Sequence, residues 1–181
     1  ERGRFESAIT VAKELVELEP GSDRYLFRLA ALYDEAGRRA DAVALLRRVI
    51  AMNPENGPAL NYLGYTFAEL GENLEEAEAL VRKALALRPN DGFFVDSLGW
   101  IFFQRGDYPA AVVELERALR LAGSDPVISE HLADASRETG KTTEALRVYR
   151  DCEARTVDGE QRIRVRHKIK DLTGKSAGGP L

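Results

Sequence analysis

The side chains that most often carry nucleophilic or metal chemistry are scarce in this sequence, which has one cysteine, Cys152, and two histidines, His131 and His167. A thiol beside a histidine can act as a nucleophile. Cys152, however, takes the position that Ala84 and Ala118 hold in two similar helical segments earlier in the chain. We therefore interpret it as a small buried core residue. His131 directly precedes a leucine of a predicted core and is expected to face outward. We predict no metal site.

Motifs that would indicate catalysis are absent. The sequence contains no glycine-rich phosphate loop, no Cys-x-x-Cys, no His-Glu-x-x-His and no Gly-x-Ser-x-Gly. Its carboxylates are numerous, but solvated helices are expected to carry them. An enzyme therefore has no positive support, and we predict neither catalytic residues nor a cofactor.

Composition describes an ordered and mildly acidic chain. Among 181 residues, 26 are Lys or Arg and 30 are Asp or Glu, for a net charge of −4, and 44% are apolar. This balance argues against intrinsic disorder and against nucleic acid as a partner, which favours basic surfaces. No apolar run approaches the roughly 18–20 residues of a membrane span, so direct membrane insertion is not expected.

Glycine and proline recur with one period. The intervals between successive members are 34 or 35 residues in both series, which are Gly3, Gly37, Gly71, Gly106 and Gly140, and Pro20, Pro54 and Pro89. A fixed period in this range is typical of stacked structural units rather than one globular core.

The segments between these residues have helical periodicity. Leu26, Leu29, Ala30 and Tyr33 lie at i, i+3, i+4 and i+7, on one face of a helix, and the pattern returns in the next two periods. A second amphipathic helix follows each glycine, which is suited to closing the first helix. Asp107 and Asp125 stand where N-caps are expected. The sequence therefore predicts an all-α fold of antiparallel helix pairs.

These features resemble the tetratricopeptide repeat (TPR) family, whose period is 34 residues. The resemblance covers nearly the whole chain and implies a right-handed superhelical solenoid. When the sequence is divided into repeats of this family, the second repeat has one extra residue near Asn73. The N-terminal helix lacks its partner helix, so we expect a fragment of a longer repeat protein. The units are a second helix at 1–22, repeats at 23–56, 57–91 and 92–125, a degenerate repeat at 126–159, a capping helix at 160–172 and a flexible tail at 173–181.

The TPR resemblance also implies which side chains line the concave groove, namely those at fixed places in each first helix. In the third unit these places hold an aromatic stripe that packing within the helix pair does not require. The resulting candidate residues for partner binding are Asn61, Tyr65, Phe93, Asp96, Trp100, Phe103, Glu130 and Asp134. Tyr65 and Trp100 occupy equivalent places and are expected to be neighbours along the groove.

Two questions stay open at this level. The aromatic side chains either form a binding surface or are covered by the rest of the solenoid or by the tail. Asp96, Glu130 and Asp134 either are ordinary solvated acids or select a partner by charge. The clamp that some TPR modules use for a carboxylate terminus needs basic residues in the groove. This sequence has acids there, which disfavours that ligand.

One basic cluster lies near the C-terminus, in Gln161–Lys170, where five Lys or Arg residues alternate with apolar residues. Strict alternation is also a strand signal, although we favour a helix. The segment either caps the last repeat, which we prefer, or binds an anionic partner.

The resulting hypothesis is a non-catalytic scaffold or adaptor that binds a segment of another protein or a peptide in its groove. Alternatives are a self-assembling solenoid, and so a homo-oligomer, or the recruitment region of a larger enzyme or protease-adaptor complex. The resemblance to multi-repeat bacterial TPR proteins suggests the envelope or periplasm, with the cytoplasm left open.

Overall fold

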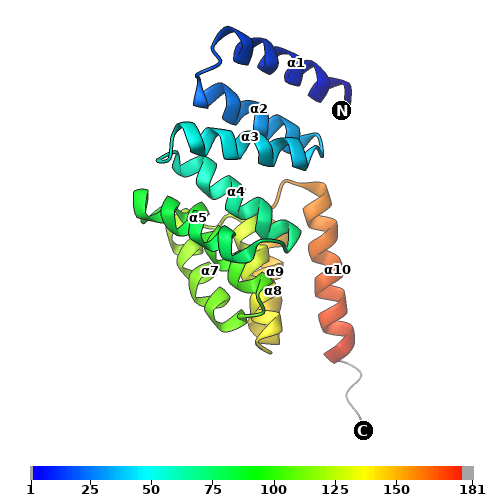
Figure 1. Ribbon diagram of the computed structural model, residues 1–181. Coiled ribbons are helices and arrows are strands. Elements are labelled where there is room, and N and C mark those ends of the chain that lie inside the picture. Colours follow the sequence, from blue (N-terminus) through cyan, green and yellow to red (C-terminus); the bar gives the residue numbers. More distant parts are fainter. Residues whose placement is uncertain (1, 177–181) are drawn as a thin grey trace. The chain divides into compact units, whose positions relative to one another are not determined.

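The computed structural model describes the backbone of residues 2–176 and the side chains of residues 5–174, and these residues form helices joined by short loops (Figure 1). The described residues contain no strand, which confirms the predicted all-α class. The helices are α1 (Arg2–Leu18), α2 (Asp23–Glu35), α3 (Arg39–Met52), α4 (Gly57–Leu70), α5 (Leu74–Leu87), α6 (Gly92–Gln104), α7 (Tyr108–Ala122), α8 (Pro126–Glu138), α9 (Thr142–Arg155) and α10 (Gly159–Ser176).

The chain divides into two compact units, Glu1–Pro89 and Asn90–Leu181. Unit 1 contains α1 to α5 and unit 2 contains α6 to α10. Each unit has its own packing and is described by itself.

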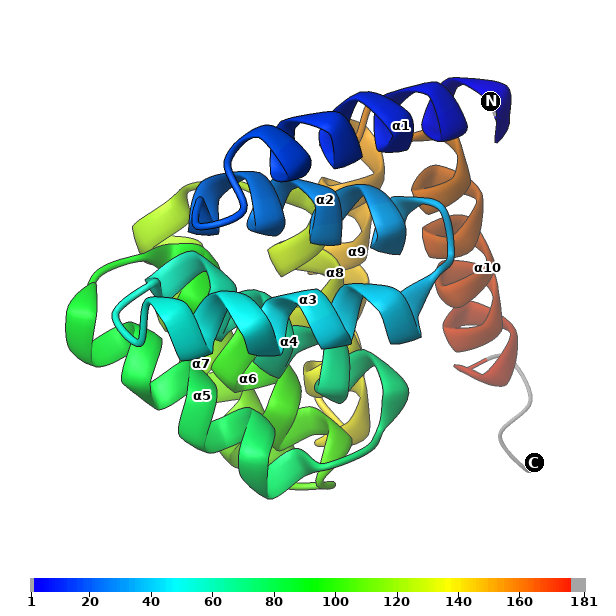
Figure 2. The same ribbon diagram turned by 45° about the horizontal axis from the view of Figure 1, so that its top comes forward.

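Unit 1 consists of two helix pairs, α2 with α3 and α4 with α5, preceded by α1, which packs along α2 (Figure 2). Gly64 brings α4 close to α5, since a Cβ atom there would lie 2.6 Å from Val81 Cγ2 and 2.8 Å from the Ala77 carbonyl oxygen. At the other end of the unit, Ile9 and Ala12 of α1 are buried in a cluster with residues of α2 and α3.

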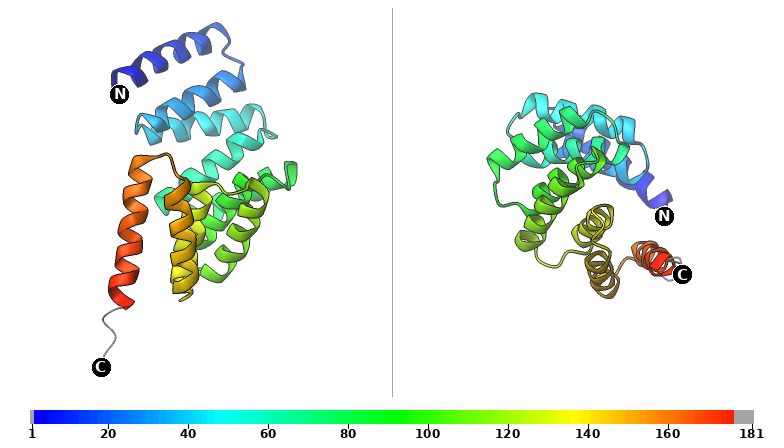
Figure 3. Two further views of the ribbon diagram at one scale, coloured as in Figure 1. Left: turned by 180° about the vertical axis from the view of Figure 1, so that it is seen from behind. Right: turned by 90° about the horizontal axis from the view of Figure 1, so that it is seen from below.

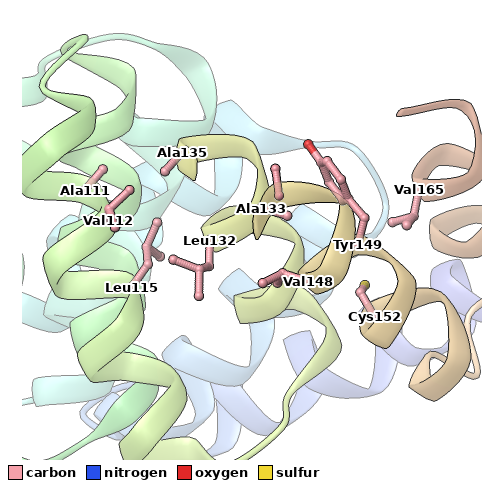
Figure 4. Packing of buried hydrophobic residues seen from close by; sticks show 11 residues of the cluster. Ala111, Val112, Leu115, Leu132, Ala133, Ala135, Val148, Tyr149, Cys152 and Val165 are labelled. Carbon is pink, nitrogen blue, oxygen red and sulfur yellow. The ribbon is translucent and has the colours of Figure 1, made fainter. Parts of the chain in front are cut away.

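Unit 2 repeats this plan with α6 paired to α7 and α8 paired to α9, while α10 packs beside α9 (Figure 3). Gly99 is the counterpart of Gly64, since a Cβ atom there would lie 2.7 Å from Leu115 Cγ. Figure 4 shows the core of this unit, where α7, α8, α9 and α10 contribute Leu115, Leu132, Val148 and Val165.

Helix ends follow the sequence signals. Asp107 and Asp125 cap α7 and α8, as predicted, because their side chains accept hydrogen bonds from the first backbone amides of those helices. The periodic glycines after the first helices have left-handed backbones, with φ of 75° at Gly37 and 65° at Gly71. Asn73, at the extra residue of the second repeat, also has a positive φ, of 50°. The period thus reflects the recurrence of a backbone turn that glycine adopts most readily.

The basic segment near the C-terminus is helical, as predicted, but its helix α10 is longer than the predicted interval of 160–172. Residues 173–176 were expected in a flexible tail, and this part of the prediction is wrong. The helix continues because Leu172 packs against the core of unit 2 and the Thr173 hydroxyl donates to the Ile169 carbonyl oxygen, at 3.0 Å. The rest of the predicted tail, residues 177–181, lies outside the described residues.

Helix α10 occupies the place of the first helix of a further repeat. One period after Leu132 and Ala133, which face α9, the sequence has Arg166 and His167, and neither of these is buried. The exposed side of α10 is therefore more polar at these two positions than the corresponding side of α8, and the capping role of α10 stays a prediction.

The close approach at Gly64 gives a first prediction. Gly64→Ala should lower the free energy of unfolding by about 1–3 kcal/mol, because the added methyl group meets backbone as well as side-chain atoms. Urea unfolding followed by circular dichroism measures this change.

Gly174→Ala is the matched control, because Gly174 also lies in a helix but has no atom within 4 Å of the added Cβ. This variant should be neutral or gain up to about 1 kcal/mol from helix propensity. Equal effects of the two substitutions would contradict the importance of the close approach.

Candidate functional site

An aromatic stack lies on the first helices of unit 2. The Trp100 ring stacks on the Phe103 ring, with centroids 4.6 Å apart, and on the His131 ring, with centroids 4.2 Å apart. Tyr108 extends the stack beyond Phe103, at 5.4 Å. These stacking contacts hold the Trp100 ring between side chains of α6 and α8.

Asp96 holds His131 in this position. The two side chains belong to residues that are 5% and 7% exposed, and Asp96 Oδ1 lies 2.9 Å from His131 Nδ1. An ionised carboxylate only accepts hydrogen bonds, so Nδ1 donates. The expectation that His131 faces outward is wrong. Its imidazole is buried between α6 and α8, where it stacks on Trp100 and is hydrogen-bonded to Asp96.

Two apolar side chains are exposed on the first turns of the same helices. Phe93 on α6 is 57% exposed and Val127 on α8 is 47% exposed, and one period separates them. Both α6 and α8 belong to unit 2 and contact each other. We call Phe93, Trp100, Phe103, Val127 and His131 the aromatic platform.

Glu130 is not a solvated groove acid. It is 4% exposed and accepts hydrogen bonds from Arg164 at 2.7 and 2.8 Å, from Lys168 at 2.8 Å and from Gln161 at 3.0 Å. Burial alone would raise its pKa, but the hydrogen bonds from Arg164 and Lys168 outweigh burial and hold the pKa of Glu130 at about 2. Glu130 is therefore ionised at neutral pH and connects α8 to α10.

Asp134 completes this arrangement. Lys168 Nζ donates to Asp134 Oδ2 at 2.7 Å, and the Tyr149 hydroxyl donates to Asp134 Oδ1 in a short hydrogen bond. Burial, followed by the charge of Asp134, raises the pKa of Tyr149 above its usual value, so the phenol keeps its proton. We call Glu130, Asp134, Tyr149, Gln161, Arg164 and Lys168 the α8–α10 ion cluster.

Both earlier interpretations of Asp96, Glu130 and Asp134 assumed exposed carboxylates, and their burial contradicts that assumption. The basic residues of Gln161–Lys170 supply the partners of two of them, so the predicted acidic groove and the predicted basic cluster neutralise each other within unit 2. The sequence held a signal for this pairing. Glu130 and Asp134 are four residues apart, as are Arg164 and Lys168, so each pair occupies one face of its helix.

Cys152 is fully buried, as predicted. Its thiol donates to the Pro126 carbonyl oxygen at 3.1 Å, and burial raises its pKa to about 12. The thiol is therefore protonated at neutral pH and is a poor nucleophile. Among residues with described side chains, no group of three His, Cys, Asp or Glu is arranged to hold a metal ion.

Unit 1 contains the other two candidate residues, Asn61 and Tyr65, both on α4 and both partly exposed. Asn61 Oδ1 is buried and has no hydrogen-bond partner. The neighbouring Tyr62 donates to Asp34 at 3.0 Å and packs edge-on against Phe27. Tyr65 and Trp100 belong to different units, so their proximity along a groove stays a prediction.

Comparison with known families agrees with the repeated helix pairs. Two tetratricopeptide repeat models match the sequence, one over residues 1–63 and 35–93 and the other over 97–156. The chain belongs to the tetratricopeptide repeat family. No curated protein matches it.

Solved structures of TPR proteins share the fold. The chain is similar to TTC0263, a thermophilic TPR protein of Thermus thermophilus, with a TM-score of 0.78, 20% identity and coverage of 94% of this chain and 91% of that one. It is also similar to PilW, a type IV pilus biogenesis factor, with a TM-score of 0.82, 18% identity and coverage of 97% and 82%. At these identities the likeness concerns the fold alone, and it confirms a TPR solenoid. Within residues 2–176 of this TPR protein, none of the helices combines the length and apolar content of a bilayer-spanning segment.

The α8–α10 ion cluster gives a second prediction. Because the pKa of Glu130 is lowered in the folded state, its contribution to stability is present above its unfolded pKa of about 4.5 and is lost as the pH falls toward 2. The amount is of the order of 3 kcal/mol. Glu130→Gln should therefore destabilise the protein at neutral pH and flatten the dependence of the unfolding free energy on pH in this acid range.

Glu153→Gln is the control, since Glu153 pairs with Arg166 on the exposed side of α10. Loss of that surface pair should cost no more than about 1 kcal/mol. Urea unfolding at a series of pH values measures both variants, and an unchanged acid dependence in Glu130→Gln would refute the role assigned to the ion cluster.

Proposed function

We propose that this TPR protein is a non-catalytic interaction scaffold that binds a segment of a partner protein on the groove side of its first helices. The family and its structural neighbours support a protein–protein interaction scaffold. The observation that carries the finer proposal is the aromatic platform, in which α6 has both the exposed Phe93 and the ring stack of Trp100 with Phe103 and His131.

The platform is suited to binding because it is preorganised. Stacking on Phe103 and His131 restricts the Trp100 ring, and the Asp96 hydrogen bond restricts His131, so little side-chain entropy remains to be lost when a partner docks. Phe93, on the same helix as Trp100, has more than half of its surface exposed. Aromatic residues in such settings frequently dominate the binding energy of an interface.

Asn61 supplies a polar element on the equivalent helix of unit 1. The residue is partly exposed, and rotation of its side chain would bring the Oδ1 atom, which has no hydrogen-bond partner, to a backbone N–H of a bound segment. We propose that, within unit 1, Asn61 is the polar contact and Tyr65, on the same helix, the apolar contact for a partner segment.

Replacement of Phe93 tests the proposal. The full chain would be used to isolate its native partner, and the affinity of the purified pair measured by calorimetry. Phe93→Gln should weaken binding about tenfold, which corresponds to about 1.4 kcal/mol. Trp100→Ala should weaken it at least as much, with circular dichroism used to establish that the variant stays folded.

Val113→Asn is the matched control, because Val113 is 62% exposed on α7, the second helix of its pair. It should leave the affinity unchanged. If Phe93→Gln and a folded Trp100→Ala variant both bind the partner as tightly as the original protein, the proposed groove function is wrong.

Asn61→Ala separates binding from folding. Removal of a buried acceptor without a partner, together with the higher helix propensity of alanine, should leave stability unchanged or raise it by up to about 1 kcal/mol. The partner affinity should nevertheless fall about fivefold, as expected for one lost hydrogen bond. Parallel urea unfolding and calorimetry measure the two effects, and a loss of stability without a loss of affinity would contradict this role.

A further inference from the structure

The chemistry of the bound segment can be inferred from the hydrogen-bond and ion-pair partners of the acidic residues around the aromatic platform. We propose that the platform binds an apolar, uncharged segment of a partner protein rather than a basic one. This inference rests on the proposed groove function and specifies the partner for it. It runs against what the sequence suggests, because the acids expected in the groove would by themselves favour lysine and arginine in the partner.

The first argument is that these acids already have partners. Glu130 and Asp134 face Arg164 and Lys168 at 2.7–2.8 Å, so these four side chains carry no net charge. Asp96 is 5% exposed and is bound to His131. A basic side chain of a partner would have to displace α10 or desolvate itself beside a buried carboxylate, and both are costly.

The second argument concerns the acids next to the exposed apolar residues. Asp91 Oδ1 accepts a hydrogen bond from the Phe93 amide at 3.1 Å, and Asp125 Oδ1 accepts one from the Val127 amide at 2.8 Å. Both carboxylates cap a helix N-terminus, whose partial positive charge offsets part of their own. They therefore bind backbone of this chain and are poor sites for a partner's cation.

The third argument is the surface that remains. Phe93 and Val127 are about half exposed on two contacting helices, α6 and α8, which also contribute Trp100 and His131 to the ring stack. Burial of such side chains contributes about 25 cal/mol per Å² of apolar surface removed from water. An apolar segment gains this term, whereas a charged segment gains less of it and finds no opposite charge in return.

The test begins with selection of peptides from a displayed random library on the full chain. Synthetic versions of the selected peptides are then titrated while the fluorescence of Trp100 is followed, since this is the single tryptophan of the protein. Selected peptides are expected to be apolar and uncharged, and their affinity should change little with ionic strength. Introduction of lysine into them should weaken binding.

Two matched valine variants locate the binding. Val127→Asn should reduce the affinity of the selected peptides about five- to tenfold, whereas Val113→Asn, outside the platform, should not change it. Selected peptides that are rich in lysine or arginine, depend on Val127 and bind less tightly at high salt would overturn this inference and leave the groove function intact. If no selected peptide depends on Phe93 or Val127, both the inference and the groove function are wrong.

Discussion

The close approach of paired helices, α4 to α5 and α6 to α7, is the constraint on which the rest of the structure depends. At Gly64 and Gly99 the backbone of the first helix comes so near the second that a single methyl group would overlap Val81 or Leu115. This approach determines the rotation of each first helix about its axis. One side is committed to its partner helix, and the residues on the remaining side become available for other contacts. The α6 residues of the aromatic platform, Phe93, Trp100 and Phe103, lie outside the face that Gly99 commits to α7.

A different kind of interaction closes unit 2. Helix α10 buries Val165 against α9 but reaches α8 through Arg164, Lys168 and Gln161. Charged groups are costly to bury, so loss of one member of this cluster is destabilising because it leaves the other charges buried without a partner. An apolar contact would tolerate a shifted helix, whereas Glu130 is satisfied only when all three donors are in place. The same contacts remove two acids from the groove surface and leave the aromatic platform with little charge around it.

The repeat period made much of the fold predictable, because it arises from local chemistry. The turn at Gly37 or Gly71 needs a left-handed residue, and the caps at Asp107 and Asp125 need a short acceptor side chain. Neither requirement depends on distant parts of the chain. The environment of His131 could not be predicted in the same way. Its hydrogen-bond partner Asp96 lies 35 positions earlier in the sequence. Only the packing of α8 on α6 decides whether these two side chains are solvated or bound to each other. The end of α10 was predicted wrongly for a related reason. A short tail that contains glycine is expected to be flexible, and the contact of Leu172 with the core of unit 2 depends on the tertiary structure.

The sequence by itself determined the class of this protein: helix pairs of fixed length, turned at glycine, with small residues where two helices meet and aromatic residues to spare in the third repeat. Those properties depend on backbone conformation and side-chain volume, which each residue carries wherever it is placed. Only the tertiary structure decided the electrostatics of the groove side. The energy of a charge depends on its distance from other charges and from water, and the carboxylates of Glu130 and Asp134 meet their counterions only when α10 folds back onto α8. The composition gives the number of these charges, but only the tertiary structure brings the opposite charges together so that they neutralise each other.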